Sequence, residues 1–345
     1  MAGTGNAHLR GEGMVLRAND INVEFKLGDK KVVKAVSGVS IDIAKGETLA
    51  VVGESGCGKS SLGKALLQLP KPTSGSVILN DVDITALHGE KLRAVRPQMQ
   101  MIFQDPISSL DPRMTVRRII EQPLKVWSDL DEQGRAKRVD ELLESVGLDP
   151  AVVGSRRPYE FSGGQCQRIS IARALALNPS MLICDEPVSA LDVSVQAQIL
   201  NLLQDMKDKF ELTMMFISHD LGVVKTVSDR VMVMYGGSVV ESAPTQNLFQ
   251  HRRHPYTQGL FAARPQLGLK RGTRLTTIPG QVPDLLNWPT ACAFADRCAH
   301  VEAACRDALP PLSQASISSD FANSNHSDTS HWVRCIKWQS IESQT

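Results

Sequence analysis

The fold is decided by the segment Gly53-Glu54-Ser55-Gly56-Cys57-Gly58-Lys59-Ser60, which matches the pattern G-x-x-x-x-G-K-[ST] at every position. The apolar run from Thr48 to Val52 precedes it and predicts a strand buried on both faces. The apolar residues that follow Lys59 fall on one face of a predicted helix. Glycines let backbone N–H groups approach phosphate oxygens, and the helix N-terminus adds positive charge. The segment therefore predicts a nucleotide-phosphate loop, in which Lys59 reaches the β- and γ-phosphates and Ser60 ligates Mg²⁺.

Strands and helices alternate on both sides of this loop, from about residue 15 to residue 260. Val39, Ile41 and Ile43 alternate with polar residues and predict a half-buried strand. Two runs at 231–235 and 238–240, joined by Gly236-Gly237, predict a tight hairpin. Residues 105–176 lack strand-like runs and are predicted to be a helical insertion. We therefore expect an α/β fold with a largely parallel sheet.

Composition limits the classes of protein that fit the sequence. The chain has 345 residues, of which 42% are hydrophobic and 22% charged, as in ordinary globular proteins. The net charge of +1 predicts no bulk attraction to nucleic acid or to an anionic membrane. No run reaches the roughly 18 to 20 apolar residues of a membrane span, and no secretory signal is visible.

The domain organisation follows from shifts in composition along the chain. We expect a flexible N-terminus at 1–14, a nucleotide-binding domain at 15–264 with its helical subdomain at about 105–176, and a C-terminal extension at 265–345. The extension is rich in proline and short of periodic elements. A segment of that kind buries little core, so we expect a small irregular domain that needs a staple.

A second apolar run, Met181 to Cys184, is followed by Asp185 and Glu186. Ligands bind at the carboxyl ends of strands in parallel α/β sheets, so both acids are expected at the nucleotide site. Asp185 is expected to face Mg²⁺ through water. Glu186 is expected near the γ-phosphate, where it polarises the attacking water as general base.

The segment Phe161-Ser162-Gly163-Gly164-Gln165-Cys166-Gln167-Arg168 resembles the signature of ATP-binding-cassette (ABC) ATPases, which other phosphate-loop NTPases lack. Ser162 and the backbone N–H groups of the next two glycines precede a helix predicted over Gln167 to Leu177, which suits anion binding. Phe161 replaces the usual leucine and Cys166 the usual arginine, whereas the four residues expected to touch nucleotide are intact.

The resemblance covers about residues 15 to 260 and implies a RecA-like phosphate-loop core with an N-terminal antiparallel β subdomain. Gln104 looks like the glutamine of the loop that leads into the helical insertion, Asp192 like the loop that crosses the dimer interface, and His219 like the switch histidine on the γ-phosphate. Phe25 is placed where the family stacks an aromatic ring on adenine. The resemblance implies that Glu186, His219 and Lys59 are catalytic and that Ser60, Gln104 and Asp185 are the Mg²⁺ ligands. The implied nucleotide-binding residues are Phe25, Gly53, Glu54, Ser55, Gly56, Cys57, Gly58, Lys59, Ser60, Ser61, Gln104, Ser162, Gly163, Gly164, Gln165, Asp185 and Asp192.

The segments His254-Pro255-Tyr256-Thr257 and Ile278 to Asp284 resemble the C-terminal extension of oligopeptide/dipeptide importer ATPases. The resemblance implies a peripheral ATPase on the cytoplasmic face of the bacterial inner membrane, which drives peptide uptake. Its implied partners are two transmembrane permease subunits, a second ATPase (a paralogue or a second copy) and an external substrate-binding protein, with no nucleic acid. Nickel or glutathione import, a soluble ABC ATPase acting on nucleic acid or ribosomes, and a degenerate ATPase are the alternatives.

Four of the seven cysteines lie near the C-terminal end, at Cys292, Cys298, Cys305 and Cys335. Four converging thiolates suit tetrahedral Zn²⁺ or an iron–sulfur cluster. The spacing is not C-x₂-C, and members of the resembling group carry a [4Fe–4S] cluster at such cysteines. We therefore expect a [4Fe–4S] cluster that staples the extension, with zinc and metal-free thiols as alternatives.

Overall fold

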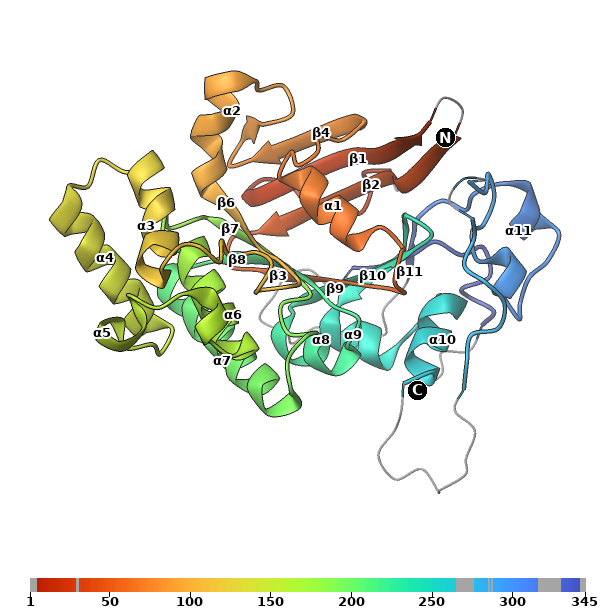
Figure 1. Ribbon diagram of the computed structural model, residues 1–345. Coiled ribbons are helices and arrows are strands. Elements are labelled where there is room, and N and C mark those ends of the chain that lie inside the picture. The colour runs from red at the N-terminus through yellow and green to blue at the C-terminus, as the bar shows by residue number, and fades with distance from the viewer. Residues whose placement is uncertain are drawn as a thin grey trace, which may run out of the picture. The chain divides into compact units, whose positions relative to one another are not determined.

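The computed structural model describes residues 5–28, 31–264, 276–284, 286, 288–315 and 330–341. The chain divides into two compact units, coloured along the sequence in Figure 1. The first unit comprises Met1–Asp42, Leu49–Thr85 and His219–Thr345, and the second comprises Ile43–Thr48 and Ala86–Ser218. The predicted boundaries after residues 14 and 264 remain predictions.

An antiparallel sheet forms one layer of the first unit, in the order β2-β1-β4-β5 (Figure 1). Its strands are β1 (Met14–Leu27), β2 (Lys31–Ala44), β4 (Ser74–Leu79) and β5 (Val82–Asp83). Leu16, Ala18 and Leu79 are buried on its inner face, where Leu16 lies opposite Leu79. The predicted antiparallel β subdomain is confirmed.

The strand predicted around Val39 is wrong in one respect, because Ser40 and Asp42 are as fully buried as their apolar neighbours. The Ser40 hydroxyl accepts a hydrogen bond from the Asp20 N–H at 2.9 Å. Asp42 lies between the guanidinium groups of Arg10 and Arg230, at 3.0 and 2.8 Å. Paired polar groups can be buried without a large penalty, so the alternation does not mark a solvent-exposed face.

The first unit also contains β3 (Thr48–Val52), which runs parallel to β9 (Arg230–Tyr235). Strand β9 turns through Gly236-Gly237 into antiparallel β10 (Ser238–Pro244), as the sequence predicts. Two short strands continue this order, β12 (His331–Val333) beside β10 and β11 (Ser313–Ala315) beside β12. The C-terminal part of the chain thus adds two short strands beside β10 within the first unit.

The helices of the first unit are α1 (Lys59–Leu66), α8 (Leu221–Val227), α9 (Thr245–Gln250), α10 (Pro255–Ala262) and α11 (Ala304–Asp307), with a 3₁₀ turn η3 (Ala295–Arg297). Three buried aromatic rings join β9, α10 and the extension. The Tyr235 ring lies 4.5 Å from the Tyr256 ring and 5.2 Å from the Phe294 ring, between centroids. The extension is therefore anchored by its own share of the apolar core.

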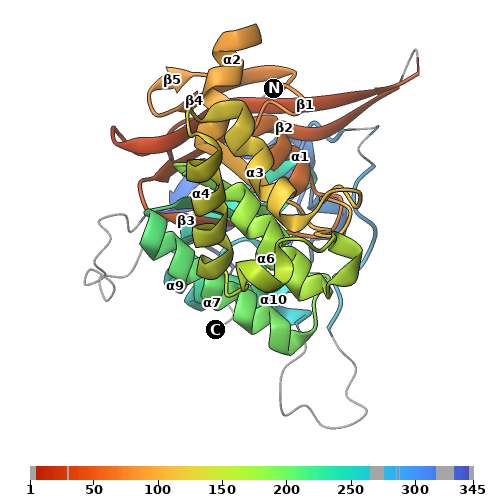
Figure 2. The ribbon, with the colours of Figure 1, turned by 60° about the vertical axis from the view of Figure 1, so that its left-hand side comes forward.

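The second unit contains three parallel strands in the order β6-β7-β8, namely β6 (Met99–Ile102), β7 (Met181–Asp185) and β8 (Thr213–Ile217). Helices fill the stretch between β6 and β7, where α3, α4 and α6 pack against one another (Figure 2). Helix α7 connects β7 to β8. The helical elements are α2 (Gly89–Val95), η1 (Arg96–Gln98), α3 (Val116–Trp127), α4 (Glu132–Ser145), α5 (Pro150–Val153), η2 (Pro158–Glu160), α6 (Gly163–Ala174) and α7 (Val193–Phe210). Within the described part of the chain, no helix has both the length and the apolarity to cross a bilayer.

Candidate functional site: the nucleotide loops and the cysteine pocket

The phosphate loop connects β3 to α1 in the first unit, as the motif requires. Gly58 precedes α1 with a φ of 99°, in the left-handed region. A Cβ at this position would lie 2.1 Å from the Ala35 carbonyl oxygen, so a side chain cannot be accommodated. The loop backbone therefore lies close to β2 at Gly58, and the first turn of α1 begins with Lys59, Ser60 and Ser61.

Lys59 is folded back over the loop that precedes it. Its Nζ donates to the carbonyl oxygens of Gly53 at 2.8 Å and Glu54 at 3.0 Å, and its side chain is almost fully buried. These bonds hold a positive charge at the N-terminus of α1, where the helix dipole also favours anions. The arrangement suits a phosphate group approaching the loop.

The thiol inside the loop is shielded. Cys57 is fully buried, and burial raises the pKa of its thiol. Burial likewise raises the pKa of Cys184, on β7, to about 12. Both thiols are therefore protonated at neutral pH, which lowers their reactivity as nucleophiles and toward oxidants.

The two acids at the end of β7 differ in environment. Asp185 is the last residue of the strand and is buried. Glu186 follows with a φ of 47°, in the left-handed region, and its N–H donates to the Ile217 carbonyl at 3.0 Å. Non-glycine residues in this region carry strain that clusters at functional sites. The strand thus presents Glu186 in a fixed, strained turn.

Gln104 lies next to Glu186, although the two residues are far apart in the sequence. Its Nε2 donates to Glu186 Oε2 at 2.9 Å. The resemblance to ABC ATPases implies Gln104 as a Mg²⁺ ligand and does not predict this bond. The bond leaves the Gln104 amide oxygen as an acceptor while its nitrogen orients the predicted general base.

The signature segment starts helix α6 four residues earlier than predicted, at Gly163. Ser162 is its N-cap, and a capping box with Gln165 is present: Ser162 N–H donates to Gln165 Oε1 at 3.1 Å, and Gln165 N–H to Ser162 Oγ at 3.4 Å. Cys166 is fully buried, and its Sγ donates to the Pro158 carbonyl. A small residue fits there, whereas an arginine would need a buried partner for its charge.

The remaining predicted residues lie at the ends of elements. Phe25 is on β1 with 40% of its surface exposed, as a ring available for stacking would be. Exposed His219 lies between β8 and α8, whose N-cap is Asp220. Asp192 is the exposed N-cap of α7, and its side chain makes no capping bond. Their contacts with nucleotide remain predictions.

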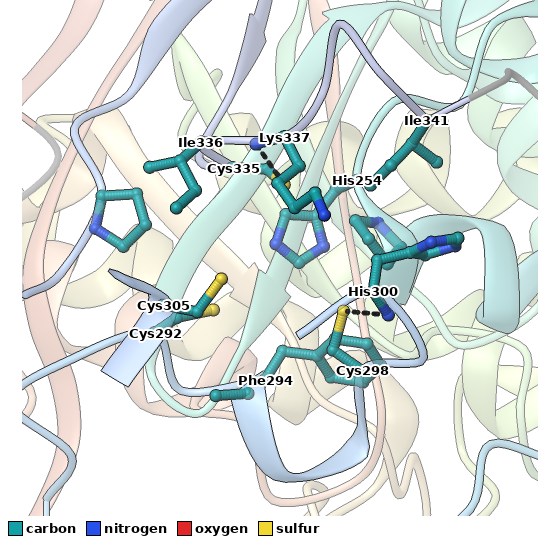
Figure 3. Close-up of a pocket in the computed structure, with 13 residues that line it drawn as sticks. His254, Cys292, Phe294, Cys298, His300, Cys305, Cys335, Ile336, Lys337 and Ile341 are labelled. Carbon is teal, nitrogen blue, oxygen red and sulfur yellow. Dashed lines mark hydrogen bonds between the residues drawn. The ribbon is translucent and has the colours of Figure 1, made fainter. Parts of the chain in front are cut away.

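The four predicted cluster cysteines, Cys292, Cys298, Cys305 and Cys335, line one pocket together with His254 and His300 (Figure 3). The Cys292 N–H donates to the Cys305 carbonyl at 3.1 Å, so these two residues are neighbours. Backbone N–H groups of His300 and Lys337 each donate to a cysteine sulfur at 3.4 Å. The structure thus brings together four thiols from separate stretches of the extension.

The pocket does not have the geometry of a metal site. Among the described residues, no group of three or more His, Cys, Asp or Glu side chains is arranged to hold a metal ion. Burial raises the pKa of Cys292 and Cys298, and that of Cys335 to about 11, so these thiols are neutral at pH 7. The predicted metal-bearing character of the C-terminal domain is therefore not evident among the described residues.

Two residues that contact the phosphate loop were not predicted. Arg297 forms an ion pair with Glu54, and the Tyr256 hydroxyl accepts a hydrogen bond from the Glu54 N–H. The sequence analysis assigned both residues to segments of the C-terminal extension and predicted no contact of these segments with the phosphate loop. No local pattern indicates such a contact, because the partners are more than 200 positions apart.

Comparisons with known proteins cover most of the chain. The ABC transporter family matches residues 36–189, and the C-terminal region of oligopeptide/dipeptide transporters matches residues 240–305. The oligopeptide transport ATP-binding protein AppF of Bacillus subtilis is 48% identical over 297 residues, 85% of this chain and 89% of AppF. The oligopeptide transport ATP-binding protein OppF of Escherichia coli is 43% identical over 318 residues, 89% of this chain and 95% of OppF.

Solved structures give the same fold. The ATP-binding cassette MJ0796, a dimer in a post-hydrolysis state bound to ADP and phosphate, aligns with a TM-score of 0.61 and 28% identity. The alignment covers 67% of this chain and 98% of that one. CbiO1 of Clostridium perfringens, part of the ABC transporter complex cbiONQ, aligns with the same score and identity over 69% of this chain and 91% of its own.

Proposed function

Because this chain belongs to the family of ATP-binding subunits of oligopeptide/dipeptide ABC transporters, we propose that it energises the uptake of di- and oligopeptides across the bacterial inner membrane. The chain is an ABC-type ATPase, which converts ATP and water to ADP and phosphate. The observation that carries the peptide assignment is the match of residues 240–305 to the oligopeptide/dipeptide C-terminal region. The net charge of +1 gives no comparable support to action on nucleic acid or ribosomes.

ATP binding rests on the phosphate loop. The backbone N–H groups of Gly53–Ser60 and the Lys59 ammonium bind the β- and γ-phosphates, while Phe25 stacks on adenine. The Ser60 hydroxyl, the Asp185 carboxylate and the Gln104 amide oxygen are hard oxygen donors that fit Mg²⁺. When bound, Mg²⁺ neutralises charge on the phosphate oxygens.

Hydrolysis rests on Glu186. Its carboxylate takes a proton from water as the water oxygen forms a bond to the γ-phosphorus. The bond from that phosphorus to the β–γ bridging oxygen breaks, and its electron pair leaves with ADP. Support comes from the 2.9 Å bond of Gln104 to Glu186, which orients the carboxylate. His219 contacts the γ-phosphate.

ABC ATPases of this kind dimerise and pair with permeases. In the dimer proposed here, Ser162 and the first N–H groups of α6 bind the ATP that the partner subunit's phosphate loop holds. The bond that the Ser162 hydroxyl donates to Gln165 Oε1 is long and weak, at 3.4 Å, so the hydroxyl can be donated to a phosphate instead. The subunit is peripheral, on the cytoplasmic face, with two transmembrane permeases and an external substrate-binding protein as partners.

Replacement of Glu186 by Gln tests the mechanism. ATP hydrolysis by Glu186→Gln should fall by roughly 10²-fold or more, since a positioned base contributes about that much. ATP binding should persist, and size-exclusion chromatography with Mg-ATP should show a stable dimer. Glu144→Gln, an exposed glutamate on α4, is the control and should hydrolyse ATP normally. Undiminished turnover in Glu186→Gln would remove the residue from the base role.

The cargo is tested in the assembled transporter. With its permeases and binding protein in liposomes, ATP hydrolysis should rise with di- or oligopeptide added outside. Stimulation by Ni²⁺ or glutathione, without a response to peptides, would replace the peptide assignment with one of those cargoes.

The cysteine pocket is the second part of the proposal. Cys292, Cys298, Cys305 and Cys335 line one pocket and match the ligands of a [4Fe–4S] cluster in kind and number, although in this structure they are not arranged around a metal ion. When bound, the cluster supplies a cross-link between stretches of the extension. Anaerobic purification should give iron, sulfide and brown colour that Cys305→Ser removes and Cys57→Ser keeps. Zinc, or no metal at all, would reject the cluster.

A further inference from the structure

The C-terminal extension contacts the phosphate loop through an ion pair between Arg297 and Glu54. Arg297 Nη1 donates to Glu54 Oε2 at 2.7 Å, and Nη2 donates to Oε1 at 3.1 Å, so the guanidinium and the carboxylate form a bidentate ion pair. The Arg297 side chain is 6% exposed and that of Glu54 25%. A forked pair with this much burial is stronger and more directional than an ordinary surface ion pair.

Arg297 is held in place by groups outside the phosphate loop. Its Nε donates to the Pro279 carbonyl at 2.8 Å, and Nη2 also reaches the Ile278 carbonyl at 3.3 Å. Its Nη1 donates to the Tyr235 hydroxyl at 3.3 Å. The hydrogen bonds to Glu54 raise the pKa of the guanidinium, so Arg297 stays charged. The extension therefore sets the orientation of Arg297 independently of the loop.

Glu54 connects Arg297 to Lys59, which is proposed to bind phosphate. Its N–H donates to the Tyr256 hydroxyl at 2.8 Å, and its carbonyl accepts from Lys59 Nζ at 3.0 Å. Both backbone groups of Glu54 and its carboxylate are thus engaged at once. A shift of the Glu54 carboxylate would move the carbonyl that positions the Lys59 ammonium.

A second contact reaches the loop through the β9–β10 turn. The Gly237 N–H donates to the Cys57 carbonyl at 3.0 Å. The Trp288 ring packs against Gly237 so closely that a Cβ there would lie 2.5 Å from a ring carbon. The extension therefore supports the loop at Glu54 directly and at Cys57 through Gly237.

We propose that Arg297 is a positioning residue for ATP binding, which through Glu54 holds the phosphate loop and Lys59 in the geometry that receives the β- and γ-phosphates. The inference rests on the proposed role of Gly53–Ser60 as the phosphate site. It gives the extension a task in nucleotide binding, besides any role of its cysteine pocket.

Steady-state kinetics of the full-length protein test the inference. Arg297→Ala should raise the KM for ATP roughly tenfold and change kcat less than about twofold, since substrate positioning is lost while Glu186 is untouched. Arg297→Lys should fall in between, because an ammonium cannot make the fork. The control is Arg306→Ala, which breaks the exposed pair with Asp296 in the same extension and should leave both constants unchanged.

A second variant separates positioning from folding. Glu54→Gln leaves Arg297 in place and should also raise the KM, and the Glu54→Gln/Arg297→Ala double variant should be no worse than the poorer single variant. Additive effects, or an unchanged KM in a folded Arg297→Ala, would overturn the inference. If the wild-type protein itself fails to bind Mg-ATP, the proposed phosphate site fails instead.

Discussion

At the scale of single residues, Glu186 has a strained backbone conformation and a side chain that its neighbours hold in place. A left-handed backbone costs a residue of this kind about 1–3 kcal/mol and persists only where neighbours impose it. Here the Ile217 carbonyl holds the Glu186 N–H and Gln104 holds its carboxylate. The carboxylate is thus fixed before a water arrives, and less reorganisation is needed in the reaction.

The Gln104 contact predicts a shift of the pH–rate profile. Gln104→Glu replaces an amide donor with a second carboxylate next to Glu186, and each of two adjacent carboxylates disfavours the ionisation of the other. The acidic limb of the profile should move to higher pH, and kcat at pH 7 should drop about tenfold or more. Gln104→Ala should lower kcat without moving the limb. Identical profiles for the two variants would contradict the proposed contact.

The burial of His8 is expected to make the free energy of unfolding depend on pH. Burial lowers its pKa below 6.5, and Arg230 and Arg334 act in the same direction, whereas its bond to the Ser40 carbonyl and nearby Asp42 oppose the shift. As pH falls below about 6.5, the unfolded chain takes up a proton that the folded chain resists, so stability falls. His8→Gln keeps a donor for Ser40 but does not titrate. Urea unfolding at pH 7 and 5.5 should show a larger loss for the wild type than for His8→Gln, and equal losses would contradict it.

The places of site residues in the fold could be predicted where they depend on neighbouring positions in the sequence. The motif around Lys59 and the acids after β7 are local, so the sequence placed them at the ends of their strands. The contacts of Gln104 with Glu186 and of Arg297 with Glu54 join residues 82 and 243 positions apart. Such contacts depend on how the whole chain folds, and no pattern of neighbouring residues predicts them.

At the scale of elements, helix ends show the same contrast. The capping box of α6 is readable from Ser162 and Gln165, yet the predicted start was Gln167, since two glycines discourage a helical reading. Strand β12 was missed because three residues carry no periodic pattern. Its place comes from the exposed edge of β10, with which it pairs through Glu241 and Ser242.

The end of α7 offers an element-scale prediction. Glu211 terminates the helix with a φ of 50°, a left-handed position at which glycine is favoured. Glu211→Gly should raise the melting temperature by roughly 2 to 4 °C by removing the Cβ strain. Glu211→Ala is the matched control, because it also loses the exposed ion pair with Lys45 but keeps the Cβ. Equal melting temperatures for the two variants would show that strain is not what limits this helix end.

At the scale of the whole molecule, the residues predicted from the sequence to bind ATP belong to both compact units. The phosphate loop and His219 belong to the first unit, and Gln104, Asp185 and Glu186 belong to the second. A ligand stabilises the elements that bind it, by about 2.7 kcal/mol at 100 times its Kd. The proposal that one ATP molecule is bound by both sets of residues therefore predicts that ATP stabilises both units.

Hydrogen exchange with Glu186→Gln, which should bind ATP without consuming it, tests this expectation. With Mg-ATP, amide exchange should slow both around α1 in the first unit and around β7 and β8 in the second, because opening of either unit must first release nucleotide. Lys59→Ala should bind ATP weakly and lose the protection in both units together. Protection confined to the first unit would mean that the acids at the end of β7 do not share the nucleotide with the phosphate loop, and that the assignment of Glu186 as the base must be given up.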